Sequence, residues 1–280
     1  MSGPPERADP ERADAPVPAP EVHRLEQVMG TVVVIDVYTG GEPFAADAYR
    51  RLARARAVLH RADAVFSTWK ADSPVSRLRR GEIGLDEVPV DVRDVLELCA
   101  TARDLSRGWF DPWAMPGGVD PTGYVKGWAA HRALLALAGP GVTGALVNAA
   151  GDVACHGNPA PGEPWRIGVA DPASPTQLAA VVEVTGAIAT SGTYERGAHL
   201  VDPRSGTPAA RAASATIVGP DLGLADALAT ALAVAGPHGL EFVEAVDGYG
   251  GLTISADGAW HATPDFPFAR EPDGPRSASP

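Results

Sequence analysis

The chain has 280 residues, of which 45% are hydrophobic and 21% charged. This composition is typical of a globular protein with ample length for a core. The formal net charge of -12, with no basic patch in the sequence, argues against a general nucleic-acid binder, because phosphate backbones would be repelled. Cys99 and Cys155 lie far apart without a CxxC or Cys/His cluster, so neither a zinc site nor a disulfide framework is indicated.

Both ends of the chain differ in composition from the middle. Residues 1–22 are rich in Pro, Ala and charge, and they lack the apolar region of a signal peptide, so we expect a disordered tail and a cytoplasmic protein. Residues 262–280 are expected to be a loose C-terminal tail, which leaves 23–261 as the folded domain. No stretch approaches about 18 uninterrupted apolar residues, so no membrane anchor is predicted.

The first half of the domain predicts one strand and two helices. A β-branched run predicts a strand over 32–38, and apolar residues at helical spacing predict helices over 47–65 and 92–105. Between these helices, residues 66–78 have the composition of a loop but carry Phe66 and Trp69. These two rings either plug the edge of the core or form an aromatic wall for a planar ligand.

Residues 108–128 carry three tryptophans among glycines and prolines, which is typical of a rigid pocket wall before a helix that runs to about residue 138. Asp120 is placed to cap this helix. Lys126 falls in its first turn, where a cation is unfavourable unless an anion lies nearby. The alternative for Lys126 is a surface side chain that turns toward solvent.

The second half predicts mostly strands. We expect strands at 145–153, 165–170, 179–185, 187–190, 213–218 and 252–255, and a short helix near 240–246. Hydroxyls and charges crowd residues 190–206, as donors around an anionic or sugar-like ligand would. Ser191 and His199 do not indicate a serine hydrolase, because no Gly-x-Ser-x-Gly motif is present. The chain also lacks the P-loop and GxGxxG nucleotide-binding motifs.

An Ala- and Leu-rich run predicts a buried helix over 225–235, ended by Gly236. Asp226 and Thr230 lie four residues apart, so a carboxylate and a hydroxyl share one face of this helix. Two such oxygens could supply part of a Mg2+ site, because hard cations prefer oxygen ligands. The alternative is that Asp226 caps the helix after Gly223 and Thr230 bonds back to a carbonyl.

Seven motifs in one order extend from about Met29 to Ser255, and together they resemble the ApbE-like family of FAD:protein FMN transferases. These motifs are Met29-Gly30-Thr31, Phe66-Ser67-x-Trp69 with Asp72-Ser73, Phe110-Asp111-Pro112, Asp120-x-x-Gly123-x-x-Lys126-Gly127, Asn148-Ala149-Ala150-Gly151-Asp152, Thr190-Ser191-Gly192 with His199-x-x-Asp202-Pro203, and Ala225-Asp226-Ala227-Leu228-Ala229-Thr230.

The resemblance implies an α+β, T-fold-like architecture with mixed or antiparallel sheets packed against helices, and two lobes with an FAD site between them. It implies Mg2+ binding by the side chains of Asp226 and Thr230 and by a backbone carbonyl at Gly123. The positions that match contacts to FAD in the family are Met29, Trp69, Asp120, Lys126, Leu200 and Ala229.

The reaction implied by the resemblance is transfer of FMN from FAD to a Ser or Thr hydroxyl of an acceptor protein, with release of AMP. Acceptors of this family carry a D-x-x-[ST]-G-A-[ST] type of motif. His199 is the candidate base, because the pKa of an ordinary histidine is near neutrality; a structural role for His199 is the alternative. Two other activities need the same pocket: hydrolysis of FAD to FMN and AMP, and FAD binding without turnover.

The chain departs from the family pattern in three places. Ala150 stands where Gly is typical, which could crowd a backbone approach to ligand. Trp69 stands where Tyr is common and keeps the ability to stack. Only eight residues separate Asp111 from Asp120, so the pocket lid is expected to differ.

Overall fold

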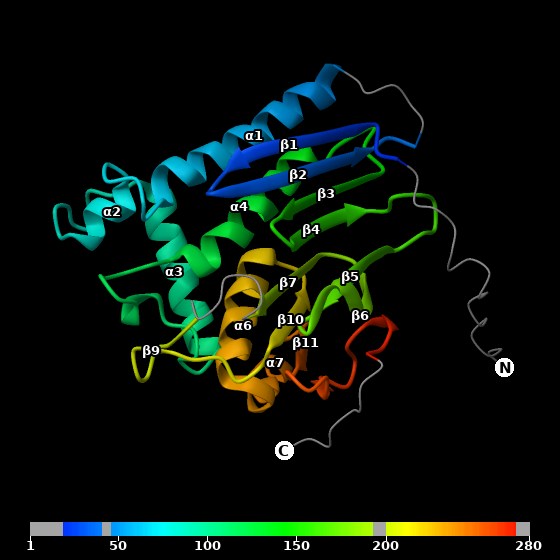
Figure 1. Ribbon diagram of the computed structural model, residues 1–280. Coiled ribbons are helices and arrows are strands. Elements are labelled where there is room, and N and C mark those ends of the chain that lie inside the picture. The colour runs from blue at the N-terminus through cyan, green and yellow to red at the C-terminus, as the bar shows by residue number, and fades with distance from the viewer. Residues whose placement is uncertain (1–18, 41–45, 193–199, 273–280) are drawn as a thin grey trace.

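The computed structural model describes residues 19–40, 46–192 and 200–272. Its largest element is an eight-stranded sheet with the strand order β1-β2-β3-β4-β7-β10-β11-β12 (Figure 1). The bounds of its strands are β1 Val22–Val28, β2 Thr31–Tyr38, β3 Gly144–Ala149, β4 Asp152–Gly157, β7 Ala187–Gly192, β10 Ser214–Gly219, β11 Gly250–Ile254 and β12 Trp260–Ala262. All the strand pairs of this sheet are antiparallel.

Two smaller sheets, six α-helices and two short 3-10 helices, Pro112–Ala114 and Gly236–Gly239, form the other secondary structure of the described residues. The sheets have the orders β13-β6-β5 and β8-β9. Their strands are β5 Trp165–Asp171, β6 Ser174–Val184, β8 Val201–Asp202, β9 Thr207–Pro208 and β13 Phe268–Arg270. The helices are α1 Ala46–Phe66, α2 Pro74–Arg79, α3 Val90–Leu105, α4 Thr122–Leu137, α6 Leu222–Ala235 and α7 Leu240–Glu244. The architecture is α+β, as the sequence predicts.

The large sheet has a core on each face. On one face it packs against the central helices α4 and α6, and α1 packs on α4 (Figure 1). On the other face it packs against the β13-β6-β5 sheet, where Tyr38 of β2 meets Trp165 of β5 edge to face at 5.5 Å between ring centroids. The helix α6 is buried along nearly its whole length, so its few polar side chains must find partners inside the protein.

Several segments differ from the sequence predictions, among them α2, which lies within the loop expected over 66–78. Strand β1 was not predicted, because its charged residues hide the period-2 pattern, yet it pairs with β2 throughout. The single strand predicted over 145–153 is a hairpin, β3 and β4, with its turn at Ala150 and Gly151. The loose tail expected from residue 262 is wrong for 262–272, because Phe266 is buried and β13 pairs with β6.

Buried Glu26 on the edge strand β1 accepts hydrogen bonds from two arginines and a histidine. Burial by itself would raise the pKa of Glu26, but hydrogen bonds from Arg24, Arg56 and His60 outweigh it and hold the pKa at about 2. These contacts tie β1 to α1, which explains how a charge-rich segment forms an ordered strand.

We therefore expect the protein to lose stability in acid through Glu26. A lowered folded-state pKa contributes stability above the unfolded value of about 4.5, and that stability is lost as pH falls toward 2. The partners are about half exposed, so we expect only about 1–2 kcal/mol. Urea unfolding between pH 6 and pH 3 checks this. The Glu26→Gln variant should have a lower free energy of unfolding than the wild type at pH 6, and this free energy should change less between pH 6 and pH 3. Free energies that fall in parallel for both proteins would contradict the prediction.

Ala150 occupies the left-handed region of backbone space, with φ of 54°, at the β3–β4 turn. A non-glycine residue there is strained by about 1 kcal/mol. The side chain is exposed and does not line the cavity described below. We expect Ala150→Gly to raise the unfolding free energy by about 0.5–1 kcal/mol. Thermal unfolding of both proteins measures the change, and a variant that unfolds at or below the wild-type temperature would contradict the prediction.

Among the described residues, no helix combines the length and the apolar character that crossing a membrane requires.

Candidate functional site

The site is built where α4 and α6 approach closely through two glycines one turn apart. A Cβ atom on Gly127 would overlap the carbonyl oxygen of Leu222 and lie 3.0 Å from Cβ of Asp226. A Cβ atom on Gly123 would lie 3.7 Å from Oγ1 of Thr230. The four-residue spacing on α4 thus matches the four-residue spacing on α6, and the carboxylate and the hydroxyl both lie against the backbone of α4.

The start of α6 is set by Asp221, not by Asp226. The Asp221 side chain accepts a hydrogen bond from the backbone N–H of Leu224 at 2.9 Å, which is the N-cap arrangement. The alternative in which Asp226 caps the helix is therefore wrong. Asp226 lies about one turn further on and is 4% exposed.

The Asp226 carboxylate lies between a backbone donor and a cation. Its Oδ2 accepts from the backbone N–H of Gly127 at 3.2 Å, and its Oδ1 lies 3.9 Å from Nζ of Lys126. In a regular helix the Gly127 N–H donates to the carbonyl of Gly123, so the carboxylate competes with this carbonyl for one donor. A carbonyl oxygen has two lone pairs, so that of Gly123 can take part in one more interaction even when its helical hydrogen bond is made.

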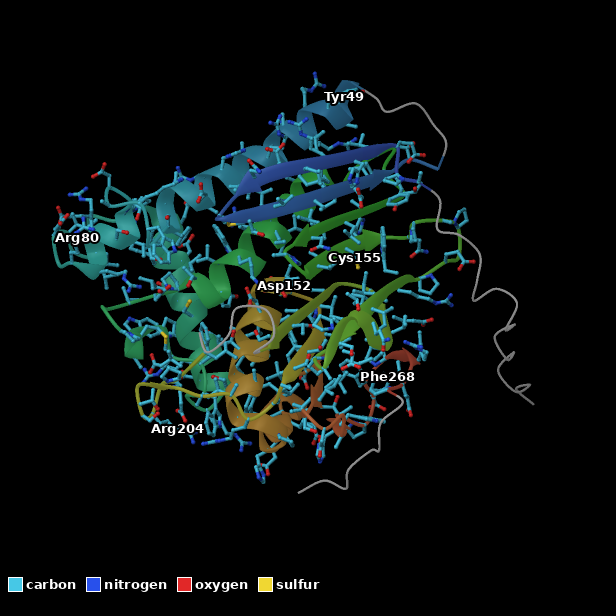
Figure 2. All side chains as sticks on the ribbon, viewed as in Figure 1. Tyr49, Arg80, Asp152, Cys155, Arg204 and Phe268 are labelled. Carbon is cyan, nitrogen blue, oxygen red and sulfur yellow. The ribbon has the colours of Figure 1, made fainter. Side chains whose placement is uncertain are left out.

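Lys126 is also paired with Asp152. Asp152 lies at the start of β4 (Figure 2). Asp152 is 1% exposed, and its other oxygen accepts from the backbone N–H of Thr190 on β7 at 3.0 Å. The predicted need of Lys126 for an anion is thus met by two carboxylates within the protein. The alternative of a Lys126 side chain that turns to solvent is wrong.

Hydroxyl groups complete the polar wall. Ser191 Oγ of β7 lies 3.3 Å from Thr230 Oγ1, and the hydroxyls of Thr190 and Thr216 are 2.9 Å apart. Within the described ranges no group of three His, Cys, Asp or Glu side chains could hold a metal ion. The potential metal ligands at this place are instead the Asp226 carboxylate, hydroxyl groups and a backbone carbonyl. This set of oxygen ligands fits Mg2+ with water or phosphate oxygens as further ligands.

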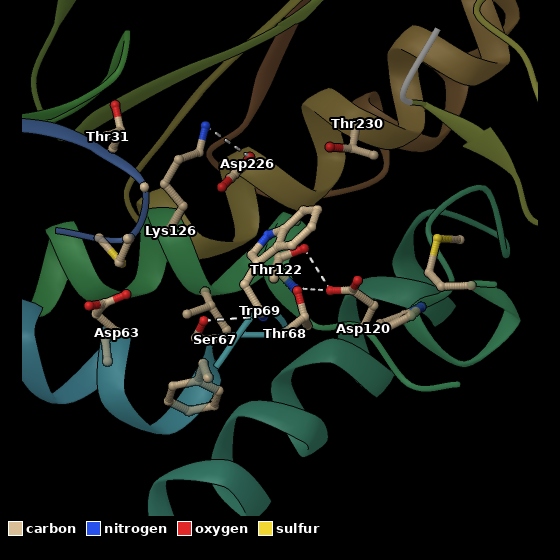
Figure 3. Close-up of a pocket in the computed structure, with 18 of the residues that line it drawn as sticks. Thr31, Asp63, Ser67, Thr68, Trp69, Asp120, Thr122, Lys126, Asp226 and Thr230 are labelled. Atoms are coloured by element: carbon tan, nitrogen blue, oxygen red, sulfur yellow. Dashed lines mark hydrogen bonds and ion pairs between the residues drawn. The ribbon is translucent and has the colours of Figure 1, made fainter. Parts of the chain in front are cut away.

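These groups face a cavity of about 1360 Å³ (Figure 3). Eight of the ten residues predicted for the site line it: Met29, Trp69, Asp120, Gly123, Lys126, Leu200, Asp226 and Thr230. Ala229 does not line it, because its side chain is fully buried inside the packing of α6. His199 lies outside the described residues. Met29 reaches the cavity from the tight β1–β2 turn, where it and Gly30 both have positive φ.

Phe66 and Trp69 have different roles: Phe66 packs in the core, and Trp69 forms an aromatic wall of the cavity. Phe66 is buried and packs edge to face on Trp128 at 5.4 Å between centroids, so it plugs the core. Trp69 is 95% exposed at the cavity (Figure 3). Its loop is held by Ser67, whose Oγ accepts from the backbone N–H of Trp69 and whose carbonyl accepts from the hydroxyl of Ser76 at 3.0 Å. A large indole exposed on an ordered loop suits stacking on a planar ligand.

Sequence reasoning missed several polar groups at or behind the cavity. Thr31, Asp63, Thr122 and Ser191 line it, and Asp152 holds Lys126 from behind. Asp152 and Ser191 belong to the recognised motifs, but the sequence assigns them no function. For Asp152 the sequence does predict a partner, because a carboxylate that follows a buried strand must be paired. Its partner is 26 residues away in sequence, and only the fold pairs them.

The fold and the site define an α+β protein with an oxygen-lined cavity that suits a metal ion and an aromatic ligand. A model described as the ApbE family matches residues 29–118 and 116–252, and the chain belongs to this family. A FAD:protein FMN transferase of Rhodobacter capsulatus is 34% identical over 158 residues, which cover 53% of this chain and 30% of that protein. A FAD:protein FMN transferase of Salmonella typhimurium is 28% identical over 151 residues, which cover 50% of this chain and 43% of that protein. The matched part therefore spans less than half the length of either relative.

Solved structures share the fold over nearly their whole length. The flavin transferase ApbE from Vibrio cholerae has a TM-score of 0.73 at 23% identity, with 88% of this chain and 97% of that chain covered. The ApbE protein from Thermotoga maritima has a TM-score of 0.74 at 23% identity, with 87% and 97% covered. These likenesses establish the fold of the family for this chain.

Proposed function

We propose that this protein transfers FMN from FAD to a Ser or Thr hydroxyl of an acceptor flavoprotein, with Mg2+ and with release of AMP. The observation that carries the proposal is a single cavity lined both by residues of α4 and α6 with oxygen ligands and by an exposed indole. The names of the curated relatives support it. The net charge of -12 is in keeping with this proposal, because in an acidic protein a pyrophosphate needs a metal ion or local donors to offset the repulsion.

Each part of the cavity wall has a task in this proposal. The carboxylate of Asp226, the hydroxyl of Thr230 and the carbonyl of Gly123 would hold Mg2+. When bound, the ion neutralises charge on the phosphate oxygens. Lys126, held by Asp152, presents a cation to the same oxygens, and Trp69 stacks on a ring of the ligand. Met29, Asp120 and Leu200 form the surrounding wall, and Ala229 supports it from within α6.

In the reaction, the acceptor oxygen forms a bond to the phosphorus on the FMN side of FAD. The pyrophosphate bond breaks, AMP leaves with the bridging oxygen, and the hydroxyl proton passes to a base. His199 stays our candidate for this base. The acceptor is proposed to be a cytoplasmic protein with a D-x-x-[ST]-G-A-[ST] type of motif.

The test mixes purified protein, FAD and Mg2+ with a polypeptide carrying that motif, and follows acceptor mass and AMP release. An FMN-sized mass gain, matched by AMP and lost with chelator, is the expected result. A matched peptide with Ala in place of the last Ser or Thr of the motif should gain no mass. If AMP and free FMN are released but the acceptor is not labelled, the activity is hydrolysis of FAD and not transfer. If FAD binds and no AMP is released, the protein is an FAD carrier.

A further inference from the structure

Arg79, the last residue of α2, has a guanidinium that contacts three groups of one loop. Its Nη1 lies 2.7 Å from Oδ2 of Asp120 and donates to the carbonyl of Val119 at 3.2 Å. Its Nη2 donates to the carbonyl of Pro116 at 3.0 Å. The Arg79 side chain is 16% exposed and that of Asp120 is 23% exposed, so this is a partly buried, well-connected ion pair.

The loop formed by residues 112–120 is folded around this guanidinium. Its two ends meet where the backbone N–H of Asp120 donates to the carbonyl of Pro112 at 2.9 Å. Gly117 and Gly118 both have positive φ, and a Cβ atom on Gly118 would lie 3.2 Å from the carbonyl oxygen of Arg79. The glycines thus allow the loop to close onto the end of α2.

The same short helix holds the other wall of the cavity. Ser73 caps α2, and the hydroxyls of Ser73 and Ser76 both donate to the carbonyl of Ser67, at the start of the Trp69 loop. Through α2, Arg79 therefore connects the loop that presents Trp69 with the loop that ends at Asp120. Both loops line the cavity.

Asp120 is fully engaged by the protein itself. Its Oδ1 accepts from the backbone N–H of Thr122 at 3.1 Å and from the Thr122 hydroxyl at 2.6 Å, while its Oδ2 contacts Arg79. With both oxygens so occupied, this carboxylate acts at the start of α4 by orienting the loop. Its orientation depends on Arg79, because the guanidinium is the contact that reaches it from outside its own loop and helix.

We propose that Arg79 is a positioning residue for FAD binding: it pins the 112–120 loop against the Trp69 loop and so preforms the cavity wall. This inference rests on the proposed function for the identity of the ligand. Pinning itself is a property of the protein without ligand, and it can be measured without FAD.

The test compares Arg79→Gln with Arg77→Gln, a matched change on the exposed face of the same helix, whose arginine lies 3.7 Å from Glu82. Two measurements are made on each full-length protein. Limited chymotrypsin digestion without ligand, read by mass spectrometry, gives the rate of cleavage after Trp113 in the loop. Quenching of flavin fluorescence gives the Kd for FAD, and the KM for FAD and kcat are measured in the transfer assay.

For Arg79→Gln we expect cleavage after Trp113 to be faster and the Kd and KM for FAD to be about tenfold higher, with kcat changed less than about threefold. In an Asp120→Asn background the same change should raise the Kd no more than about threefold, because the two residues act together. Arg77→Gln should match the wild type. Unchanged cleavage, or an unchanged Kd, in Arg79→Gln would overturn the inference. A wild type that does not bind FAD would overturn the proposed function instead, and the cleavage rates would still decide whether Arg79 pins the loop.

Discussion

Asp226→Asn is expected to lower the rate of FMN transfer by about 100-fold or more at saturating FAD. The amide oxygen can still accept from the backbone N–H of Gly127, so the contact between α4 and α6 is retained. The negative charge that would hold Mg2+ is lost, and loss of metal stabilisation of the transition state costs several kcal/mol. The rate is measured as acceptor labelling over a Mg2+ titration.

The matched control is Asp221→Asn, on the same helix. Asp221 caps α6 through Leu224 and does not line the cavity, and Asn is as good a cap, so this variant should transfer FMN at the wild-type rate. Thermal unfolding of both variants shows whether the helix is intact. An Asp226→Asn protein within about threefold of the wild type, with the same Mg2+ dependence, would remove Asp226 from the proposed metal site.

Lys126→Met is expected to lower the free energy of unfolding by about 3 kcal/mol, measured by urea denaturation at pH 7 without FAD or metal. The reason is Asp152, which is 1% exposed and contacts the ammonium group. Removal of one partner of a buried ion pair leaves the other charge in a poorly solvating interior, at a cost of about 3–5 kcal/mol. We take the lower figure because Lys126 itself is 24% exposed.

The double variant Lys126→Met with Asp152→Asn separates the ion pair from the packing of the lysine chain. The amide that replaces the Asp152 carboxylate can still accept from the backbone N–H of Thr190 but carries no charge, so most of the lost stability should return. A double variant as unstable as Lys126→Met would show that the aliphatic stem of Lys126, and not its charge, stabilises the site. A loss below about 1 kcal/mol in the single variant would contradict the expected cost of an unpaired Asp152.

The sequence by itself determined the four longest helices of the described chain and the family, whereas α2 lies in a stretch whose composition predicts a loop. The apolar spacing of α1 and α3 and the Ala-rich run of α6 are local signals, and helix formation responds to local signals. The seven ordered motifs placed Asp226, Thr230, Gly123 and Lys126 together before any contact was known. Six of the seven motifs contribute residues to the lining of the same cavity, and the motif at 148–152 supplies Asp152, the partner of Lys126.

Strand β1 was decided by tertiary structure. Its charges contradict a strand pattern, and its order comes from β2 and from Arg56 and His60 of α1, which are 30 and 34 residues beyond Glu26. A local pattern cannot report such partners, because propensity for a strand depends on what the strand packs against. The loose tail expected from residue 262 failed for the same reason, since Phe266 is buried by strands distant in sequence.

The charge arrangement of the site was likewise decided by the fold. The sequence indicated that Lys126 needs an anion, and the structure supplies Asp152 and Asp226 from two other elements. Arg79 carried no signal at all, because its partners lie 37–41 residues ahead in a loop whose shape depends on Gly117 and Gly118. Residue type and spacing determined which chemistry the chain can perform, whereas long-range packing decided which groups meet, because burial leaves each charge only the partners that the fold brings within reach.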